Sequence, residues 1–163
     1  MTVRTIRTLP DPVLRQRAKK IRTIDSSVEK LITDMLETLH ADTGRAGLAA
    51  PQIGIPLRVI VISLPEDEKD IVLINPEIVK KSGERTVTEG CLSVPGYYAE
   101  ITRAESVTAK GRDRTGKEVR IKAQGLMAQA LEHEIDHLNG NLYVDHVESP
   151  EKLHRVKAEE TEL

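Results

Sequence analysis

The chain has 163 residues, of which 39% are hydrophobic and 31% are charged, with a formal net charge of −2. This length suffices for one domain with its own core, and the composition is typical of a globular protein. Because basic and acidic residues are interspersed, the totals predict neither a DNA-binding surface nor a membrane surface. Phe and Trp are absent, so the core must consist mainly of Val, Ile, Leu and Ala.

Targeting signals and cysteine usage bear on the cellular compartment. Residues 1–10 lack the apolar stretch of a secretory signal, and no apolar run approaches the roughly 18 residues that a membrane span needs. The single cysteine, Cys91, cannot form an internal disulfide. We therefore expect a cytoplasmic protein.

Hydrophobic periodicity predicts two helices with strands between them. Residues 26–40 have helical spacing, with Ser26 or Ser27 available as the N-cap. The β-branched runs 57–64 and 71–74 have the length of strands.

The second half of the chain continues this pattern. Residues 105–110 and 119–123 predict a hairpin around the turn 113–116, and residues 125–138 predict a helix that ends at Asn139-Gly140. Ser149-Pro150 is a plausible start for a terminal helix.

This order of elements indicates an α+β fold, with an antiparallel or mixed sheet packed around the helix at 125–138. No repeat or long linker divides the chain. We expect one domain over residues 1–163, in which 149–163 form a terminal helix or tail.

Two histidines four residues apart give the strongest chemical signal. In His133-Glu134-Ile135-Asp136-His137 both imidazoles share one face of the predicted helix, so they can reach one metal ion. Glu134 lies one step round the helix, where it could act as a general base on metal-bound water. The alternative is a solvated helix face that carries two histidines by chance.

A third ligand decides the class of metal site. Metzincins continue this motif to a third histidine, but the corresponding position is Tyr143, and His146 and His154 lie further on. Cys91, in the expected loop Glu89-Gly90-Cys91-Leu92-Ser93, offers a thiolate that zinc or ferrous iron binds well. A lone cysteine is more often a small buried hydrophobe. Beside two histidines that lack a third ligand, Cys91 is the preferred candidate.

The segment 46–54 (Ala-Gly-Leu-Ala-Ala-Pro-Gln-Ile-Gly) combines small residues with one amide. Small residues allow close approach of the backbone, and the Gln52 amide could donate to an oxyanion. The alternative is a tight packing turn in which Gln52 is merely exposed.

Taken in chain order, these three segments resemble the motifs of the peptide deformylase family. That family has Gly-hydrophobic-Gly-hydrophobic-Ala-Ala-x-Gln, Glu-Gly-Cys-hydrophobic-Ser and His-Glu-hydrophobic-Asp-His. The matching residues here are 45–52, 89–93 and 133–137, and the entry segment 9–15 is also similar. The resemblance therefore spans nearly the whole chain.

The resemblance implies a metal-dependent hydrolase that removes the N-formyl group from formyl-methionine of nascent polypeptides and releases formate. Cys91, His133 and His137 would hold one divalent ion, expected to be Fe²⁺, for which Zn²⁺, Ni²⁺ or Co²⁺ could substitute. Glu134 would move the proton between water and the departing amine.

The same resemblance assigns the groups that contact the substrate. The backbone N–H of Leu92 and the amide of Gln52 would hold the oxyanion. Gly47, Leu126, Gln129 and Ala130 would bind the substrate, the last three because they share the helix face of His133 and could form the slot for the methionine side chain. The alternative for Gln129 is an exposed helix position.

The sequence departs from the family pattern at three places. Arg45 replaces the first Gly of the first motif, at the expected rim of the substrate cleft. Glu132 stands where many relatives have Gln, and we expect its side chain to point to solvent. In the segment 95–99 an Arg that would contact the peptide backbone is missing.

Two other classes of protein remain open. A zinc endopeptidase is disfavoured by Tyr143 and by the cysteine segment, and a non-catalytic metal-binding protein leaves Glu134 and Gln52 without a purpose.

We expect formyl-methionyl nascent peptides as partners, no contact with DNA or membranes, and a monomer. The tail from Ser149 is expected to be solvated, with contact to the ribosome as the alternative.

Overall fold

The computed structural model describes residues 2–67 and 69–156. Two α-helices and eight strands lie within these residues, joined by short 3-10 turns. In chain order they are α1 (Ser26–His40), β1 (Gly47–Ala49), β2 (Val59–Ile62), β3 (Ile71–Ser82), β4 (Arg85–Cys91), β5 (Val94–Arg103), β6 (Ser106–Arg112), β7 (Glu118–Gln124), α2 (Gly125–Leu138) and β8 (His154–Arg155).

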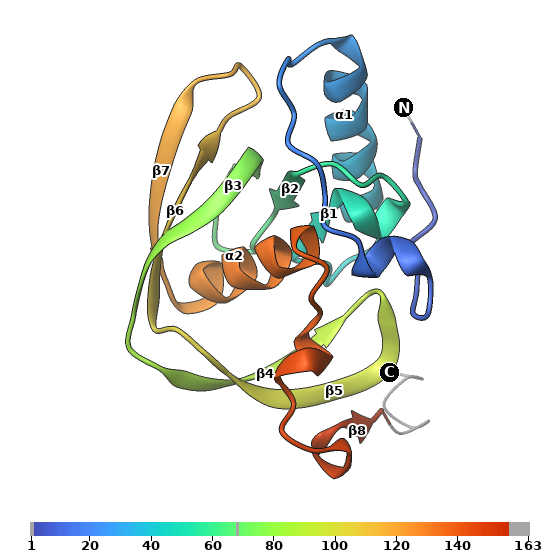
Figure 1. The fold of residues 1–163 in the computed structure, drawn as a ribbon, viewed down its shortest axis with the longest axis vertical. Coiled ribbons are helices and arrows are strands. Elements are labelled where there is room, and N and C mark those ends of the chain that lie inside the picture. The colour runs from blue at the N-terminus through green and yellow to red at the C-terminus, as the bar shows by residue number, and fades with distance from the viewer. Residues whose placement is uncertain (1, 68, 157–163) are drawn as a thin grey trace.

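The strands form two antiparallel sheets. The larger sheet has the order β1-β2-β3-β6-β7, and the smaller one has the order β4-β5-β8. Helix α2 lies at the centre of the molecule, between the strands of the larger sheet and the β4–β5 pair (Figure 1). The predicted α+β fold around this helix is confirmed.

Apolar side chains of α2 pack against the inner face of the larger sheet, which explains why the helix is central. One buried cluster joins residues of both elements: Ile60, Leu73, Val107, Ala109 and Ala123 from the strands and Ala128, Leu131 and Ile135 from the helix. Helix α1 covers β1 and β2 through a second cluster that contains Ile32, Met35, Val59 and Val61. Because neither of these two clusters contains an aromatic side chain, packing of aliphatic side chains holds α2 in place.

The predicted hairpin and the predicted end of α2 are confirmed. Strands β6 and β7 pair in register around the turn after Arg112. Gly140 follows α2 with a φ of +79°, and a Cβ atom there would lie 2.6 Å from the carbonyl oxygen of Arg15. Only glycine fits both requirements.

Three local predictions are wrong. Asp25, and not Ser26 or Ser27, caps α1: its carboxylate accepts from the backbone N–H of Ser27 and Val28 at 3.0 and 3.2 Å. Ser26 is already the first helical residue, so its side chain is one position too late to cap. The cysteine segment is not a loop, because β4 extends to Cys91.

The third concerns the tail. The structure has one 3-10 turn, Pro150–Lys152, where a terminal helix was expected, and β8 then pairs with Tyr97 and Tyr98 of β5. No side chain caps the turn at Ser149, and the chain directly after it pairs with β5, so the turn is not extended into an α-helix. Residues 157–163 of the expected tail lie outside the described residues. No described helix is long and apolar enough to cross a membrane.

The expectation that Glu132 points to solvent is also wrong, because the residue is only 5% exposed. One carboxylate oxygen accepts from the backbone N–H of Ala104 at 3.0 Å, and the other pairs with Nζ of Lys81 at 2.9 Å. Glu132 therefore connects α2 to β3 and to the β5–β6 turn, on the side of the helix that faces away from Glu134.

Replacing Glu132 with Ala should lower the free energy of unfolding by about 1–3 kcal/mol, since the buried N–H of Ala104 loses its acceptor. Glu132→Gln keeps an oxygen at that place and should lose much less. Urea denaturation of both variants measures the difference. Equal losses would mean that the hydrogen bond to Ala104 contributes little.

Candidate metal centre

The three candidate ligands come together from two elements. His133 and His137 lie one turn apart on α2, and Cys91 ends β4. Sγ of Cys91 lies 3.3 Å from Nε2 of His137, and the ligand atoms of all three residues lie within 4.8 Å of one another. No other described group of three His, Cys, Asp or Glu side chains is so arranged.

This donor set fits a divalent metal ion. One thiolate and two imidazoles are ligands that zinc and ferrous iron both accept. His137 is 1% exposed and its Nδ1 has no hydrogen-bond partner among the described residues. Tyr143, which takes the place of the third histidine of a metzincin, packs its ring over that of His133 with 6.5 Å between centroids and stays outside the cluster.

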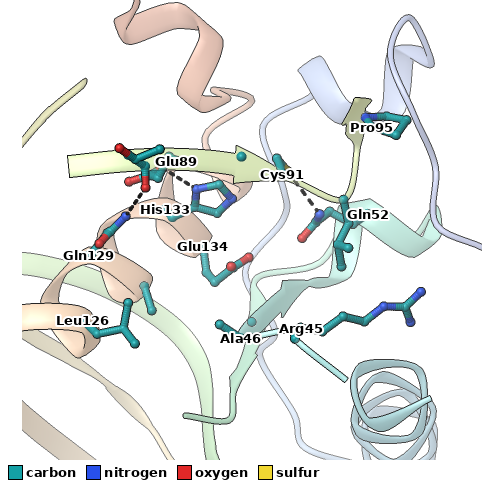
Figure 2. A pocket seen from close by; sticks show the side chains of 16 residues that line it. Arg45, Ala46, Gln52, Glu89, Cys91, Pro95, Leu126, Gln129, His133 and Glu134 are labelled. Atoms are coloured by element: carbon teal, nitrogen blue, oxygen red, sulfur yellow. Dashed lines mark hydrogen bonds and ion pairs between the residues drawn. The ribbon is translucent and has the colours of Figure 1, made fainter. Parts of the chain in front are cut away.

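A buried acid that the sequence reasoning left without a role orients His133. Oε1 of Glu89 lies 2.6 Å from Nδ1 of His133, so Nε2 of that ring is free to face Cys91 (Figure 2). Two hydrogen bonds of 2.7 Å from Arg103 hold the Glu89 carboxylate. Burial alone would raise the pKa of Glu89, but Arg103 and His133 outweigh it and lower that pKa to about 2. The sequence feature that could have revealed this orienting role is the position of Glu89, two residues before Cys91.

Arg103 continues this network to the surface. It also donates to Oδ2 of Asp136 at 2.8 Å, and the same oxygen lies 2.9 Å from Nε2 of the half-exposed His146. Asp136 within the helical motif is therefore a structural acid, and His146 is a partner of Asp136 and not a ligand.

Glu134 faces the cleft from α2 and packs against Gly47. A Cβ atom on Gly47 would lie 2.6 Å from Oε2 of Glu134, so only glycine leaves room for this carboxylate. Its Oε1 is buried and has no hydrogen-bond partner among the described residues. Burial raises the pKa of Glu134 to about 7.

Gln52 is buried, which excludes the alternative of an exposed turn residue. Its Oε1 accepts from the N–H of Ala49 at 2.9 Å, which fixes the orientation of the amide. Nε2 donates to Oγ of Ser93 at 3.2 Å and to Sγ of Cys91 at 3.6 Å. The donor end of the amide therefore faces the cluster of ligands.

The other predicted site residues line the same cleft, which has a volume of about 450 Å³. Leu126 lies in the cleft wall and is 53% exposed (Figure 2), whereas Ala130, which also lines the cleft, is buried. Gln129 reaches across to β4 and donates to the carbonyl oxygen of Thr88 at 3.3 Å, so it is not simply an exposed helix position. Gly47 and Leu92 complete the set of predicted residues in the cleft wall.

Arg45 lies at the rim, and its guanidinium points away from Glu134 (Figure 2). It donates to the carbonyl oxygen of Thr38 and pairs with Asp42 at 3.1 Å. The extra side chain thus ties the rim segment to the C-terminal end of α1, where a cation is favourable.

Removing the Glu89 carboxylate should weaken metal binding. Glu89→Ala leaves Nδ1 of His133 and the buried Arg103 without their partner, and loss of such an orienting acceptor reduces metal affinity by about 10–100-fold. Competition with a chromophoric chelator measures this affinity. Glu89→Gln, which keeps one acceptor oxygen, should retain more of it; unchanged affinity in Glu89→Ala would exclude an orienting role.

Comparison with known proteins agrees with this geometry. The family model for polypeptide deformylase matches residues 3–153. A peptide deformylase of Dehalococcoides mccartyi (strain CBDB1) is 58% identical over 156 residues, which cover 96% of this chain and 93% of the relative. One from Thermomicrobium roseum is 49% identical over 169 residues, covering 99% and 96%.

Solved structures show the same fold. The crystal structure of a peptide deformylase from Legionella pneumophila superposes with a TM-score of 0.88 at 50% identity, covering 93% of this chain and 89% of that one. The peptide deformylase from Synechococcus elongatus in complex with actinonin gives a TM-score of 0.87 at 42% identity, covering 93% and 82%. The chain belongs to the peptide deformylase family, whose enzymes remove the N-formyl group from nascent polypeptides and depend on a metal ion.

Proposed function

We propose that Cys91, His133 and His137 hold the metal ion of this deformylase and that Glu134 is its general base. One observation carries the proposal: the three ligand atoms lie within 4.8 Å of one another, and Cys91 and His133 line the same cleft as Glu134, whose Oε1 has no hydrogen-bond partner among the described residues. A divalent ion at this place supplies a Lewis acid that polarises the formyl carbonyl and lowers the pKa of water.

The proton moves through Glu134. Its Oε1 accepts a proton from the attacking water as the new C–O bond forms at the formyl carbon. The same carboxyl group then gives the proton to the nitrogen as the C–N bond breaks, so that water and formamide become formate and a free amine. Its unpartnered oxygen supports this role, because no hydrogen bond within the described protein has to be broken first.

The developing oxyanion is stabilised by two donors. Gln52 Nε2 is oriented by the bond from Ala49 to its oxygen, and the N–H of Leu92 follows directly on Cys91 in the cleft wall. Donors fixed before the reaction need no reorganisation during it, which is why such groups act chiefly on the transition state.

Leu126, Gln129 and Ala130 form the slot for the methionine side chain, and Gly47 lets the substrate backbone approach Glu134. The position of all four in the wall of one cleft supports this assignment. Since β4, β5 and α2 all contribute to the site, we assign residues 1–163 to one catalytic domain. We further propose that this domain acts as a monomer in the cytoplasm, beside the ribosome, and that its substrates are formyl-methionyl nascent peptides.

Glu134→Gln keeps the shape of the side chain but removes the base. Formate release from a formyl-methionyl peptide should fall by at least about 10²-fold while metal content stays unchanged. Glu132→Gln is the matched control, because Glu132 faces the other side of α2 and should keep its activity. Parallel loss of metal and activity in Glu134→Gln would place Glu134 among the ligands.

Gln52→Ala should lower kcat by about 10²–10³-fold with little change in KM, the usual result of removing one oxyanion donor. Steady-state formate release measures both constants. Ser93→Ala is the control, since it removes the hydroxyl that accepts a hydrogen bond from the Gln52 amide but leaves that amide in place as a donor. A normal kcat in Gln52→Ala would make Gln52 a packing residue.

We also propose that the ion is Fe²⁺. Apoprotein reloaded without oxygen should give a higher kcat/KM with iron than with zinc, and the iron form should decay in air while nickel and cobalt forms persist. The iron form should decay in air because iron beside a thiolate is open to oxidation, and because Cys91 has no second cysteine with which to form a disulfide. An equally active zinc form, or an iron form stable in air, would contradict the choice of iron.

A further inference from the structure

The outer face of the larger sheet is a second surface with a distinct chemistry. Along β6 and β7 side chains alternate, and Val107, Ala109 and Ala123 point inward to α2. Their neighbours therefore point outward, on the side of β6 and β7 away from α2 (Figure 1). None of the described helices covers this side of the two strands.

This outer face is strongly cationic, although the chain as a whole has a charge of −2. Register and alternation place eleven side chains on it: Glu77, Lys80 and Ser82 of β3; Ser106, Thr108, Lys110 and Arg112 of β6; and Glu118, Arg120, Lys122 and Gln124 of β7. Five of them are basic and two are acidic. Basic residues therefore outnumber acidic ones on this face, in contrast to the chain as a whole.

Opposite charges pair at two places on this surface, Glu77 with Lys110 and Glu118 with Arg112, but like charges also face one another. Lys110 is paired directly with Arg120 across the β6–β7 ladder, and Lys80 and Lys122 lie on either side of Thr108. Lys110 has an acidic neighbour, Glu118, at 3.3 Å, but Lys80, Arg120 and Lys122 form no ion pair with a described residue. Like charges directly across a ladder destabilise a sheet, and an anion bound between them would relieve the repulsion.

Part of this face lines a groove of about 530 Å³. Its polar side chains are those of Lys80, Lys122, Thr108, Gln124 and the hydrogen-bonded pair Ser82 and Ser106, whose hydroxyl oxygens lie 3.1 Å apart. Ammonium groups, hydroxyls and an amide are the donors that proteins use on phosphate oxygens. The groove therefore offers charge and hydrogen bonds to one kind of ligand.

We propose that this groove and the adjoining Arg120 and Lys110 bind the phosphate backbone of RNA. The three tyrosines of the chain lie elsewhere, on β5 and at residue 143, so the face has no ring on which a base could stack. It also presents no row of large apolar side chains that would insert into a lipid surface. Contacts to phosphates without base recognition fit this composition.

RNA is favoured over DNA by the activity of the family. The substrate is the beginning of a newly made polypeptide, which exists only where messenger and ribosomal RNA are present. Phosphate contacts on this face would keep the enzyme near its substrate, while the cleft beside Glu134 stays free. This step rests on the deformylase activity, but the binding itself can be measured without turnover.

The test is fluorescence anisotropy with a labelled RNA duplex of about 20 base pairs, titrated with the metal-loaded enzyme at several salt concentrations. For about three phosphate contacts, the logarithm of the affinity should fall against the logarithm of salt with a slope of about −2 to −3. The triple variant Lys80→Gln, Arg120→Gln, Lys122→Gln should bind at least about 10-fold more weakly and lose most of that slope.

A matched variant separates the face from net charge. Arg22→Gln, Lys30→Gln, Lys69→Gln removes three exposed cations from other parts of the surface and should bind RNA like the unmodified enzyme. Lys80→Arg, Lys122→Arg keeps the charge and should also bind. All variants should release formate from a short formyl-methionyl peptide at the normal rate, which shows that they are folded.

Three results would overturn the proposal. Equal weakening in both triple variants would mean that net charge alone attracts RNA. Vesicles with anionic lipid that bind as tightly as the RNA duplex would contradict the choice of ligand. Absence of salt-dependent binding at low salt would exclude a phosphate site altogether, and would leave the deformylase activity untouched.

Discussion

The buried ion pair between Glu89 and Arg103 is the interaction on which the candidate metal centre depends. It joins β4 to β5, and through His133 and Asp136 it fixes both strands to α2. Two buried charges are stable only because each satisfies the other with good geometry; removal of one partner of such a pair typically destabilises a protein by about 3–5 kcal/mol. The position of Cys91 relative to the two histidines therefore follows from a contact that is not itself part of the ligand set.

This dependence explains which parts of the site the sequence could predict. Local spacing was sufficient for α1, for α2 and for the shared face of His133 and His137, because a helix converts spacing directly into position. It could not show that Cys91 ends a strand. Gly90 interrupts the run of β4, and the ladder with β5 has an irregularity between Glu89 and Cys91. That strand is defined by its pairing and not by its own residues.

The charge distribution was hidden from the sequence for a similar reason. Basic residues are spread along the chain, and only the register of β3, β6 and β7 brings five of them to one outer face. A shift of one residue in any of these strands would turn the same side chains into the aliphatic core. Because the inner positions are occupied by Val107, Ala109 and Ala123, the register that buries α2 also determines the cationic face.

Glu132 and Glu134 show how environment separates an acid with both oxygens engaged from one with a free oxygen. Both are buried on α2, two positions apart, and the sequence offers no means of ranking their accessibility. Both oxygens of Glu132 are engaged, one by a backbone N–H and one by Lys81. Oε1 of Glu134 has no such partner, and the absence of a side chain at Gly47 provides the space beside it. The general base that we propose needs an oxygen that is free to accept a proton, and of these two carboxylates only that of Glu134 has an oxygen without a partner among the described residues.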